Sequence, residues 1–289
     1  MTIVKLSGGL GNQMFQYATG IAVASQNGLE LQLDTTEYSR TWNTKDTPRT
    51  YDLPVFGITT PIATTDQIKN NKYPLGVLSK LSRFIRRKIF RDFLLYYHPE
   101  IFSCTQPSLY LEGFFQSEKN FLGIREKLLN IFTLQTQYKD AHVLKLEKII
   151  SDIQSISIHI RRGDYAQNSD TNKYHGLCPI SYYETAMKFM SKKAPHPHFF
   201  IFSDDIAWVK ENLKIPFPHT YVSGNDLIPT QEIYLMSKCK HNIIANSTFS
   251  WWGAWLNQNP DKIVIAPKKW TNKVPDPHPN IIPETWIRM

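Results

Sequence analysis

The sequence predicts an α/β protein built on parallel sheets. Short apolar or alternating runs, typical of buried strands, recur along the chain, and stretches with the three- and four-residue apolar spacing of helices separate them. Strands that alternate with helices of about ten residues indicate doubly wound parallel sheets. The chain of 289 residues is long enough for two such domains. We expect them over residues 1–150 and 151–289, with a cleft between them.

The opening of the chain predicts a strand–loop–helix–strand unit. An apolar strand over residues 3–6 leads into a glycine loop, and an amphipathic helix over 12–27 ends at Asn27-Gly28. The alternating run 30–34 predicts the next strand. The loop would therefore lie at the carboxyl end of the first strand, where open α/β sheets place their ligand sites.

The remaining elements follow the same alternation. In the first half we expect irregular loops, a helix, a strand and two helical stretches, in that order, at 40–78, 78–97, 110–115, 118–132 and 139–151. In the second half we expect strands at 156–161, 198–203, 242–246 and 263–266, a polar loop at 163–179, and helices at 181–191, 208–213, 230–239 and 249–257.

Composition narrows the classes of function. Hydrophobic residues make up 42% of the chain, which allows a sizeable core. Its three cysteines are odd in number and far apart, which argues against a disulfide framework or a zinc knuckle and fits a reducing cytoplasm. The N-terminus lacks a basic segment followed by an apolar run, and no window holds about 18 uncharged apolar residues. We therefore expect neither a signal peptide nor a membrane span.

Much of the net charge of +8 lies in one segment. Residues 78–97 hold six basic residues against the single acid Asp92, with apolar residues three and four apart. This pattern predicts a basic amphipathic helix, suited to peripheral contact with an anionic membrane at the inner face of the inner membrane. The alternative is an ordinary surface helix with its apolar face on the core. No nucleic-acid motif accompanies the charge, so we expect no nucleic-acid partner.

Two segments place glycines or arginines where a strand gives way to a helix. Ser7–Gln13 allows a tight turn and a close ligand approach, although it is neither a dinucleotide fingerprint nor a Walker loop. His159–Tyr165 reads His-Ile-Arg-Arg-Gly-Asp-Tyr. Its adjacent guanidinium groups match phosphate oxygens bidentately, which predicts capture of a phosphorylated ligand. A structural Arg–Asp ion pair at the strand end is the alternative.

Two further segments have the same placement. Phe202–Asp205 ends a strand with two acids, one of which can cap the next helix while the other holds a guanine edge. Ala245–Ala254 sets four polar residues at the start of a helix, an arrangement that suits a phosphate: Asn246, Ser247, Thr248 and Ser250. Together the four segments predict an anion cradle that needs no metal.

All four segments together resemble the bacterial α-1,2-fucosyltransferases of glycosyltransferase family 11. The matching motifs are Gly-Gly-Leu-Gly-Asn-Gln-x-Phe-Gln-Tyr-Ala, His-x-Arg-Arg-Gly-Asp-Tyr, Phe-Ser-Asp-Asp and Asn-Ser-Thr-Phe-Ser-Trp-Trp-Gly-Ala, at 8–18, 159–165, 202–205 and 246–254. The stretches 112–116 and 173–179 also look like family features. The resemblance implies a GT-B-like fold of two facing Rossmann-like domains, the first on the acceptor side and the second on the donor side.

The resemblance also implies an activity: inverting, metal-independent transfer of L-fucose from GDP-β-L-fucose to the 2-hydroxyl of a terminal β-galactose. The acceptor would be a glycan or glycolipid such as O-antigen, and no cofactor is expected. Arg161 would grip the β-phosphate, with Arg162 assisting or pairing with an acid such as Asp164. His159 and Asp204 would contact the guanine and ribose. The other donor-binding candidates are Gly9, Gly11, Asn246, Ser247, Thr248 and Ser250.

The general base that accepts the galactose hydroxyl proton stays open among several residues. Asp164 lies within the arginine motif, but its neighbouring arginines should depress its pKa and its basicity. Asn12 sits where related protein fucosyltransferases carry a catalytic side chain, yet an asparagine orients a hydroxyl better than it removes a proton. Asp170 and His175 lie in the adjacent loop, and His175 and Gln116 are candidate acceptor contacts.

Two other functions remain alternatives to this activity. A nucleotide-sugar- or glycan-binding module without turnover would keep the anion cradle and lack the base. A transferase of the same kind could also take another GDP-sugar as its donor.

Overall fold

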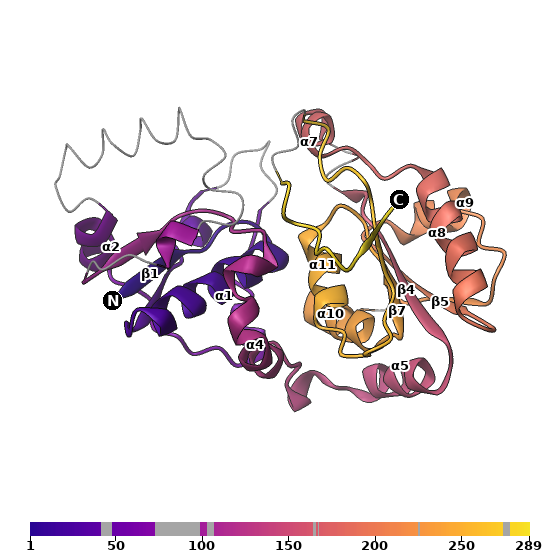
Figure 1. The fold of residues 1–289 in the computed structure, drawn as a ribbon, viewed down its shortest axis with the longest axis horizontal. Helices are drawn as coiled ribbons and strands as arrows, with labels where there is room; N and C mark the ends of the chain where they lie inside the picture. Colours follow the sequence, from indigo (N-terminus) through magenta and orange to yellow (C-terminus); the bar gives the residue numbers. More distant parts are fainter. Residues whose placement is uncertain are drawn as a thin grey trace. The chain divides into compact units, whose positions relative to one another are not determined.

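The computed structural model describes residues 1–41, 48–72, 99–102, 107–163, 166, 168–224, 226–273 and 278–289. The predicted basic helix over 78–97 and the predicted catalytic Asp164 lie outside these residues, as does the side chain of Asp170. The chain divides into two compact units, residues 1–131 with 277–283 and residues 132–276 with 284–289. Each unit holds a parallel sheet, which confirms the predicted α/β class (Figure 1).

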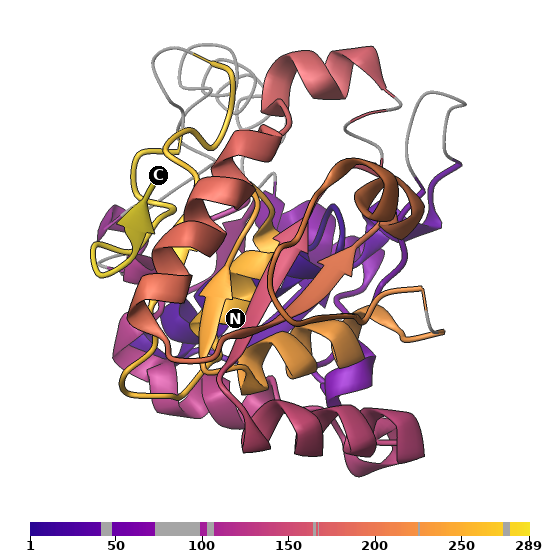
Figure 2. The ribbon, with the colours of Figure 1, turned by 90° about the vertical axis from the view of Figure 1, so that its right-hand side faces the viewer.

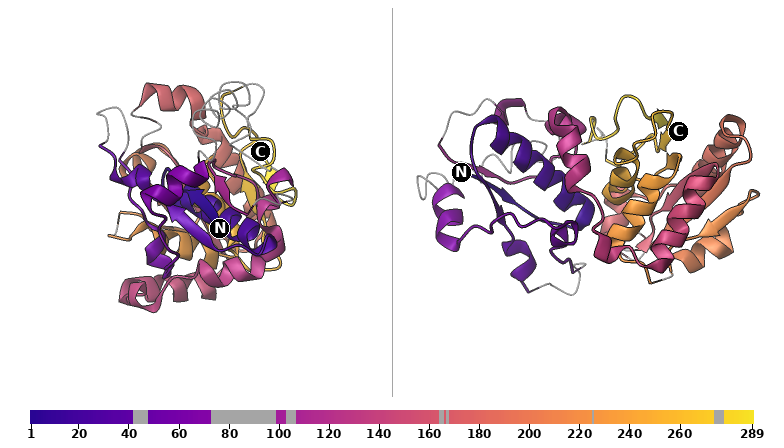
Figure 3. Two further views of the ribbon diagram at one scale, coloured as in Figure 1. Left: turned by 90° about the vertical axis from the view of Figure 1, so that its left-hand side faces the viewer. Right: turned by 90° about the horizontal axis from the view of Figure 1, so that it is seen from below.

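The first unit is a three-stranded parallel sheet in the order β2-β1-β3, comprising β1 (Thr2–Lys5), β2 (Leu31–Asp34) and β3 (Leu109–Leu111). Helix α1 (Leu10–Gln26) lies along one face of it (Figure 3, right). Helix α2 (Thr65–Lys72) covers the other face by packing Ile68 against Ile3 and Tyr110. Successive side chains of a strand point to opposite faces, so the sheet is covered on both.

Short helical segments complete the first unit and lead into the second. They are η1 (Thr36–Ser39), η2 (Leu53–Phe56), η4 (Pro99–Ile101), η5 (Glu118–Asn120), η6 (Leu122–Ile124), α4 (Arg125–Ile131) and η7 (Thr136–Tyr138).

The second unit is a six-stranded parallel sheet in the order β6-β5-β4-β7-β8-β9. Numbered within the unit, this is the order 3-2-1-4-5-6 of the Rossmann fold. The strands are β4 (Ser155–Ile160), β5 (His198–Ser203), β6 (His219–Tyr221), β7 (His241–Ile243), β8 (Val264–Ala266) and β9 (Ile287–Arg288). The helices are α5 (Ala141–Asp152), α7 (Ser169–His175), α8 (Ile180–Lys193), α9 (Ile206–Asn212), α10 (Pro229–Lys238) and α11 (Thr248–Trp255).

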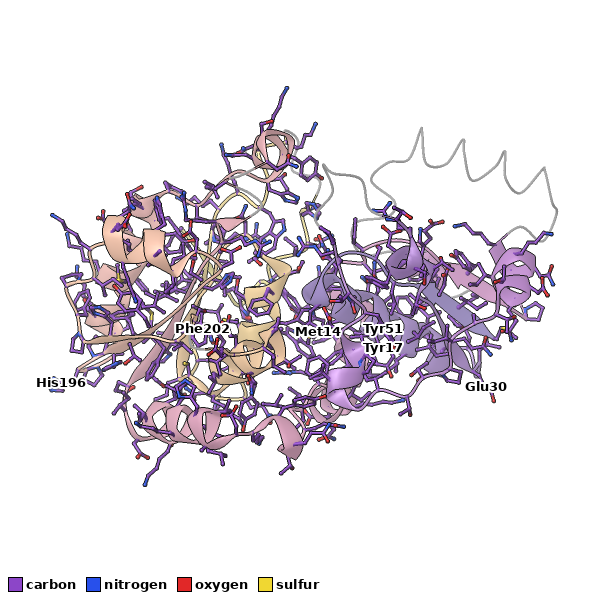
Figure 4. The ribbon with its side chains drawn as sticks, turned by 180° about the vertical axis from the view of Figure 1, so that it is seen from behind. Met14, Tyr17, Glu30, Tyr51, His196 and Phe202 are labelled. Carbon is purple, nitrogen blue, oxygen red and sulfur yellow. The ribbon has the colours of Figure 1, made fainter. Side chains whose placement is uncertain are left out.

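Helices cover both faces of this sheet. α8 and α9 lie on one face, and α10 and α11 lie on the other (Figures 1 and 2). The core on the α8 face joins Ile156, Ile158 and Ile160 of β4 to Met187 and Met190 of α8. Phe202 of β5 is buried in the middle of the unit, whereas His196 lies at its rim (Figure 4). The period-two isoleucines of β4 therefore form the core that the sequence predicts.

Several predicted boundaries are wrong. α1 begins at Leu10, so Gly11 lies in the first turn of the helix and not in the loop. Helices α2 and α7 form inside the stretches 40–78 and 163–179 that we expect to be irregular, because neither has a strong apolar periodicity. Strands β6 and β9 are too short, at three and two residues, to show an alternation. Among the described residues, no helix has the length and apolar character needed to cross a membrane.

Gly253 of α11 tests how tightly α10 and α11 pack. A Cβ added at Gly253 would lie 2.8 Å from the Cβ of Met236 in α10, an atom too close to the backbone to swing away. We expect Gly253→Ala to lower the free energy of unfolding by about 1–3 kcal/mol through overpacking. Denaturant unfolding followed by tryptophan fluorescence measures this, since Trp251, Trp252 and Trp255 lie on α11.

The matched control is Gly123→Ala, where an added Cβ meets nothing within 4 Å. It should leave the unfolding free energy within about 0.5 kcal/mol of the wild type. Equal effects of the two substitutions would contradict close packing of α10 on α11.

Candidate active site

The carboxyl end of β4 is the point of the second unit where the strand order reverses. The chain continues from β4 outward on one side through β5, and later on the other side through β7. Open α/β sheets bind ligands in the crevice outside the strand ends at such a point. The register pairs Ile160 with Ser203 and Ile158 with Ile243. Continued past the strand ends, it sets Arg161 level with Asp204 and Asn246.

Arg161 and Asp204 form an ion pair across the ends of β4 and β5. Nη1 of Arg161 lies 2.7 Å from Oδ2 of Asp204, and both side chains are partly exposed. The other carboxylate oxygen, Oδ1, accepts the backbone N–H of Arg162 at 2.8 Å. Asp204 therefore orients the guanidinium group of Arg161 and compensates its charge, although it lies outside the motif His159–Tyr165. Its proposed contact with the nucleoside stays a prediction.

Gly163 makes this ion pair sterically possible. A Cβ added at Gly163 would lie 2.4 Å from Oδ2 of Asp204, the oxygen that contacts Arg161. Any larger residue at this position must displace the carboxylate. The motif contains the glycine, but its sequence does not show which side chain the glycine makes room for.

Arg162 is held by α9. Its Nε lies 3.4 Å from Oδ2 of Asp205, and its guanidinium carbon lies 3.5 Å from the centroid of the Trp208 ring. Oδ1 of Asp205 accepts the backbone N–H of Trp208 at 3.2 Å and so caps the helix. Of the two adjacent acids, Asp205 is thus the helix cap. Sequence reasoning missed Trp208, although its position three residues after the cap is the first-turn position that a cap contacts.

His159 is a buried neutral side chain beneath Arg161. It is 3% exposed, and its ring packs against Phe249 of α11 with the centroids 5.5 Å apart. Nδ1 has no hydrogen-bond partner among the residues that the structure describes. Burial, and then the charge of Arg161, lower the pKa of His159 to about 3. His159 is therefore an uncharged imidazole and not a cation at neutral pH.

Asn246 is committed to the protein's own backbone. Its Nδ2 donates to the carbonyls of His175, Gly176 and Trp270 at 3.0–3.2 Å. Cys178 lies against its Oδ1, with the sulfur 3.5 Å away. Asn246 thus fixes the loop after α7 beside the end of β7, and this contact places the backbone of His175 at the edge of the site.

The N-terminus of α11 completes the site on the β7 side. Ser247 occupies the N-cap position but makes no side-chain capping hydrogen bond with the described residues. Ser250 is fully buried and donates to the carbonyl of Ser247 at 3.3 Å. Thr248 is partly exposed. A helix N-terminus without a side-chain cap attracts an anion through its amides and its dipole.

The remaining candidates lie together in the first unit. Gly9 is the N-cap of α1, and Gly11 is buried in the first turn of that helix. Gln116 donates from Nε2 to Oδ1 of Asn12 at 2.9 Å. Gly8 has φ +75°, and an added Cβ would collide with Asn12, so Gly8 is the glycine that the loop requires. The sequence motif contains Gly8 but does not distinguish it from Gly9.

The arrangement in the second unit suits an anionic ligand with an extended polar part. Arg161 supplies a charged planar donor, and the N-terminus of α11 supplies amides and the positive end of a helix dipole. Among the described residues, no group of three or more His, Cys, Asp or Glu side chains is placed to hold a metal ion.

Comparison with known families identifies the class of protein. The family model described as "Glycosyl transferase family 11" matches residues 1–287, nearly the whole chain. The chain belongs to glycosyltransferase family 11.

Individual relatives agree with this assignment. The chain is 35% identical over 285 residues to the O-antigen biosynthesis glycosyltransferase WbnK of Escherichia coli, covering 92% of this chain and 93% of that protein. It is 34% identical over 302 residues to an α-1,2-colitosyltransferase of Escherichia coli, covering 100% and 99%. Galactoside α-(1,2)-fucosyltransferase 1 of Leontopithecus chrysomelas is 25% identical, over 86% of this chain and 63% of that protein.

Among solved structures, the chain is similar to fucosyltransferases. A mutant of FUT1 from Arabidopsis thaliana in complex with GDP gives a TM-score of 0.49 at 13% identity, covering 95% of this chain and 72% of that chain. The fucosyltransferase NodZ from Bradyrhizobium gives 0.47 at 13% identity, covering 87% and 91%.

The buried neutral state of His159 predicts a pH dependence of stability. The ordinary pKa of 6.5 applies in the unfolded chain, so between pH 6.5 and about 3 the unfolded state binds a proton that the folded state excludes. The free energy of unfolding therefore falls as the pH falls through this window. Relative to His159→Gln, the wild type should lose roughly 1.5 kcal/mol between pH 6.5 and 5.

Denaturant unfolding of both proteins at several pH values measures the difference, in which the other titrating groups cancel. A difference that does not change between pH 7 and 5 would contradict a buried neutral His159.

Proposed function

We propose that the protein transfers L-fucose from GDP-β-L-fucose to the 2-hydroxyl of a terminal β-galactose, with inversion and without a metal ion. The observation that carries the proposal is the placement of Arg161. In a chain of glycosyltransferase family 11, a charged guanidinium group oriented by Asp204 stands at the point of a Rossmann-order sheet where the strand order reverses. Ligands of such sheets bind at that point.

The second unit is the donor side in this proposal. The negatively charged diphosphate of the nucleotide sugar binds to Arg161 and to the N-terminus of α11. Together they supply the positive potential that a metal ion would otherwise provide. Arg162, held by Asp205 and Trp208, adds a second fixed positive charge beside it. The nucleoside lies toward the end of β5, near neutral His159 and Asp204.

The reaction requires charge stabilisation and removal of one proton. The bond between C1 of fucose and the β-phosphate oxygen breaks through an oxocarbenium-like state, and its electron pair leaves with GDP. The galactose O2 attacks from the opposite face, so the β-linked donor gives an α-linked product. A positioned donor aimed at the developing charge contributes roughly 3–4 kcal/mol to such a step, and Arg161 is the candidate here.

The hydroxyl proton goes to a general base on the acceptor face. The candidates are Asp164 and Asp170, whose side chains lie outside the described residues, and His175 at the end of α7. Asn12 orients a hydroxyl but is no base. The natural setting that we propose is the assembly of O-antigen on a glycolipid at the cytoplasmic face of the inner membrane, with the segment 78–97 as the membrane contact.

A second donor is favoured by one specific observation. The chain aligns end to end with an α-1,2-colitosyltransferase at 34% identity, above the 25% shared with a mammalian α-(1,2)-fucosyltransferase. Colitose is fucose without its 3-hydroxyl. A site that hydrogen-bonds this hydroxyl discriminates strongly against the deoxy sugar, whereas an apolar site distinguishes the two poorly. Transfer of colitose from GDP-colitose is therefore the competing activity, and it uses the same diphosphate site.

Acceptor-dependent release of GDP tests the proposal directly. With lactose as the acceptor, we expect release from GDP-fucose that survives EDTA and a product that NMR identifies as 2′-fucosylated with an α linkage. Arg161→Ala should lower kcat/KM by at least about a hundredfold. Arg161→Lys should recover only part of the loss, because an ammonium group keeps the charge without the planar fork.

The control substitution is Lys192→Ala, which removes an exposed positive charge from α8 and should leave turnover unchanged. Faster release of GDP from GDP-colitose than from GDP-fucose would show that the donor is GDP-colitose. A protein that binds GDP-fucose but turns over with no galactoside would be a binding module. Loss of activity in EDTA, restored by a divalent cation, would overturn metal independence.

Gly163→Ala tests whether Asp204 prepares Arg161 for the diphosphate. The added Cβ would lie 2.4 Å from Oδ2 of Asp204 and must push the carboxylate off the guanidinium group. We expect the Kd for GDP, measured by calorimetry, to rise about tenfold, which corresponds to ~1.4 kcal/mol. Gly123→Ala, with nothing within 4 Å of its added Cβ, should leave the Kd unchanged. An unchanged Kd in Gly163→Ala would show that GDP binding does not depend on this ion pair.

A further inference from the structure

Two amide side chains meet in the first unit at its own reversal of strand order. β1 pairs with β2 on one side and with β3 on the other, and both pairings are parallel. Asn12 stands in the first turn of α1, after β1, and Gln116 follows β3. Nε2 of Gln116 donates to Oδ1 of Asn12 at 2.9 Å. The hydrogen bond therefore joins the carboxyl ends of two neighbouring strands, where a ligand of this sheet would bind.

Asn12 is fixed on its other side by Gly8. Gly8 has φ +75°, and a Cβ added there would lie 2.6 Å from Nδ2 of Asn12. The carbonyl of Gly8 in turn accepts from Tyr38 Oη at 3.1 Å and from Gln13 Nε2 at 3.2 Å. In the amide of Asn12, Oδ1 accepts the hydrogen bond from Gln116, and Nδ2 packs against the backbone of Gly8.

The backbone next to Gln116 is also fixed by hydrogen bonds. Gln116 follows Phe115, a buried residue at φ +51°, a left-handed conformation that is strained for a non-glycine residue. The carbonyl of Phe115 accepts from the backbone of Ser117 at 2.8 Å and from Nδ2 of Asn120 at 3.0 Å. The strained backbone persists because these contacts enforce it, and such strain concentrates at functional sites.

The interior position of Gln116 makes its hydrogen bond to Asn12 directional. Gln116 is 6% exposed, and its Oε1 has no hydrogen-bond partner among the described residues. Turning the amide of Gln116 over by itself would remove the donor from Oδ1 of Asn12 and set two carbonyl oxygens against each other, so the two amides can turn over only together. A buried group left without a hydrogen bond is destabilised, so the orientation of the Gln116 amide sets the orientation of the Asn12 amide.

We propose that Gln116 is a positioning residue that holds the amide of Asn12 with its N–H₂ group as the hydrogen-bond donor to an oxygen of the sugar substrates. The inference rests on the proposed transferase function and deepens it. Gln116 occupies one lone pair of Oδ1 of Asn12 and leaves the N–H₂ group for the substrate, so in this proposal Asn12 acts as a donor; its amide oxygen is too weak a base to take the galactose hydroxyl proton. The proton must then go to another residue.

Gln116→Glu tests this orientation. A carboxylate cannot donate to Oδ1 of Asn12 but accepts from Nδ2, so the amide should turn over and present its oxygen. At neutral pH we expect kcat to fall by at least about tenfold, and the affinity for GDP, bound by the second unit, to stay within about twofold of the wild type.

The same variant carries a readout that loss of packing would not give. A protonated carboxyl donates again, so activity relative to the wild type should return as the pH falls through the pKa of the introduced group. Burial raises that pKa above its ordinary value of about 4.3, which brings the recovery into the range of about pH 5–6. A pH profile parallel to that of the wild type would overturn the proposal. Gln137→Glu, an exposed site, controls for the added charge.

Asn12→Asp is the complementary variant, and it keeps the test decisive if Gln116→Glu does not fold. Aspartate still accepts from Gln116 but has no N–H to donate. We expect turnover to fall at least about tenfold with binding of GDP intact. Retained or increased turnover would show that Asn12 acts as an acceptor and would overturn the proposal. A wild type that neither binds GDP-fucose nor turns it over would instead sink the proposed function itself.

Discussion

The register of β4 between β5 and β7 is the constraint on which the second unit depends. β4 is buried along its whole length, and its pairings set the residues that follow β4, β5 and β7 side by side. A slip by one residue would turn Ile158 and Ile160 away from the α8 face, toward the face that α11 covers, and would turn His159 away from Phe249. The same pairings bring Arg161 to Asp204. Core packing and site geometry are thus consequences of one alignment.

The Arg161–Asp204 pair shows how the guanidinium group of the candidate site is held in place. A partly buried guanidinium group without a partner would be costly, and a partner bound too deeply would compete with the ligand. Here the partner is partly exposed, at 26% for the Asp204 side chain, so solvent screens the pair. The pair therefore orients Arg161 more than it stabilises the fold, and under the proposed function an incoming diphosphate would share or replace the carboxylate.

The two units share one backbone feature but place different side chains on it. Each has a β-strand at which the strand order reverses, followed by a glycine-containing motif that allows a side chain to approach closely: Asn12 at Gly8, and Asp204 at Gly163. In the first unit, the side chain at the glycine is the neutral amide of Asn12, which is paired with the amide of Gln116. Such amides distinguish hydrogen-bond donors from acceptors. In the second unit, the contact is between charges, which attract an anion. Under the proposed function, the amide site binds a sugar and the charged site binds a diphosphate.

The sequence by itself determined the α/β class, most of the strands and helices, the family, and the segments in which the candidate site lies, because apolar periodicity and glycine, arginine and acid placement are local properties. It did not determine which partner each polar side chain takes. Asp204 and Asp205 are adjacent and equivalent in sequence, yet one pairs with Arg161 and the other caps α9 beside Trp208. Asn246 looks like a ligand contact but holds backbone carbonyls.

Gln116 and Asn12 are 104 residues apart, and only the parallel pairing of β1 with β3 makes them neighbours. Such partnerships depend on register and strand order, which tertiary packing alone decides.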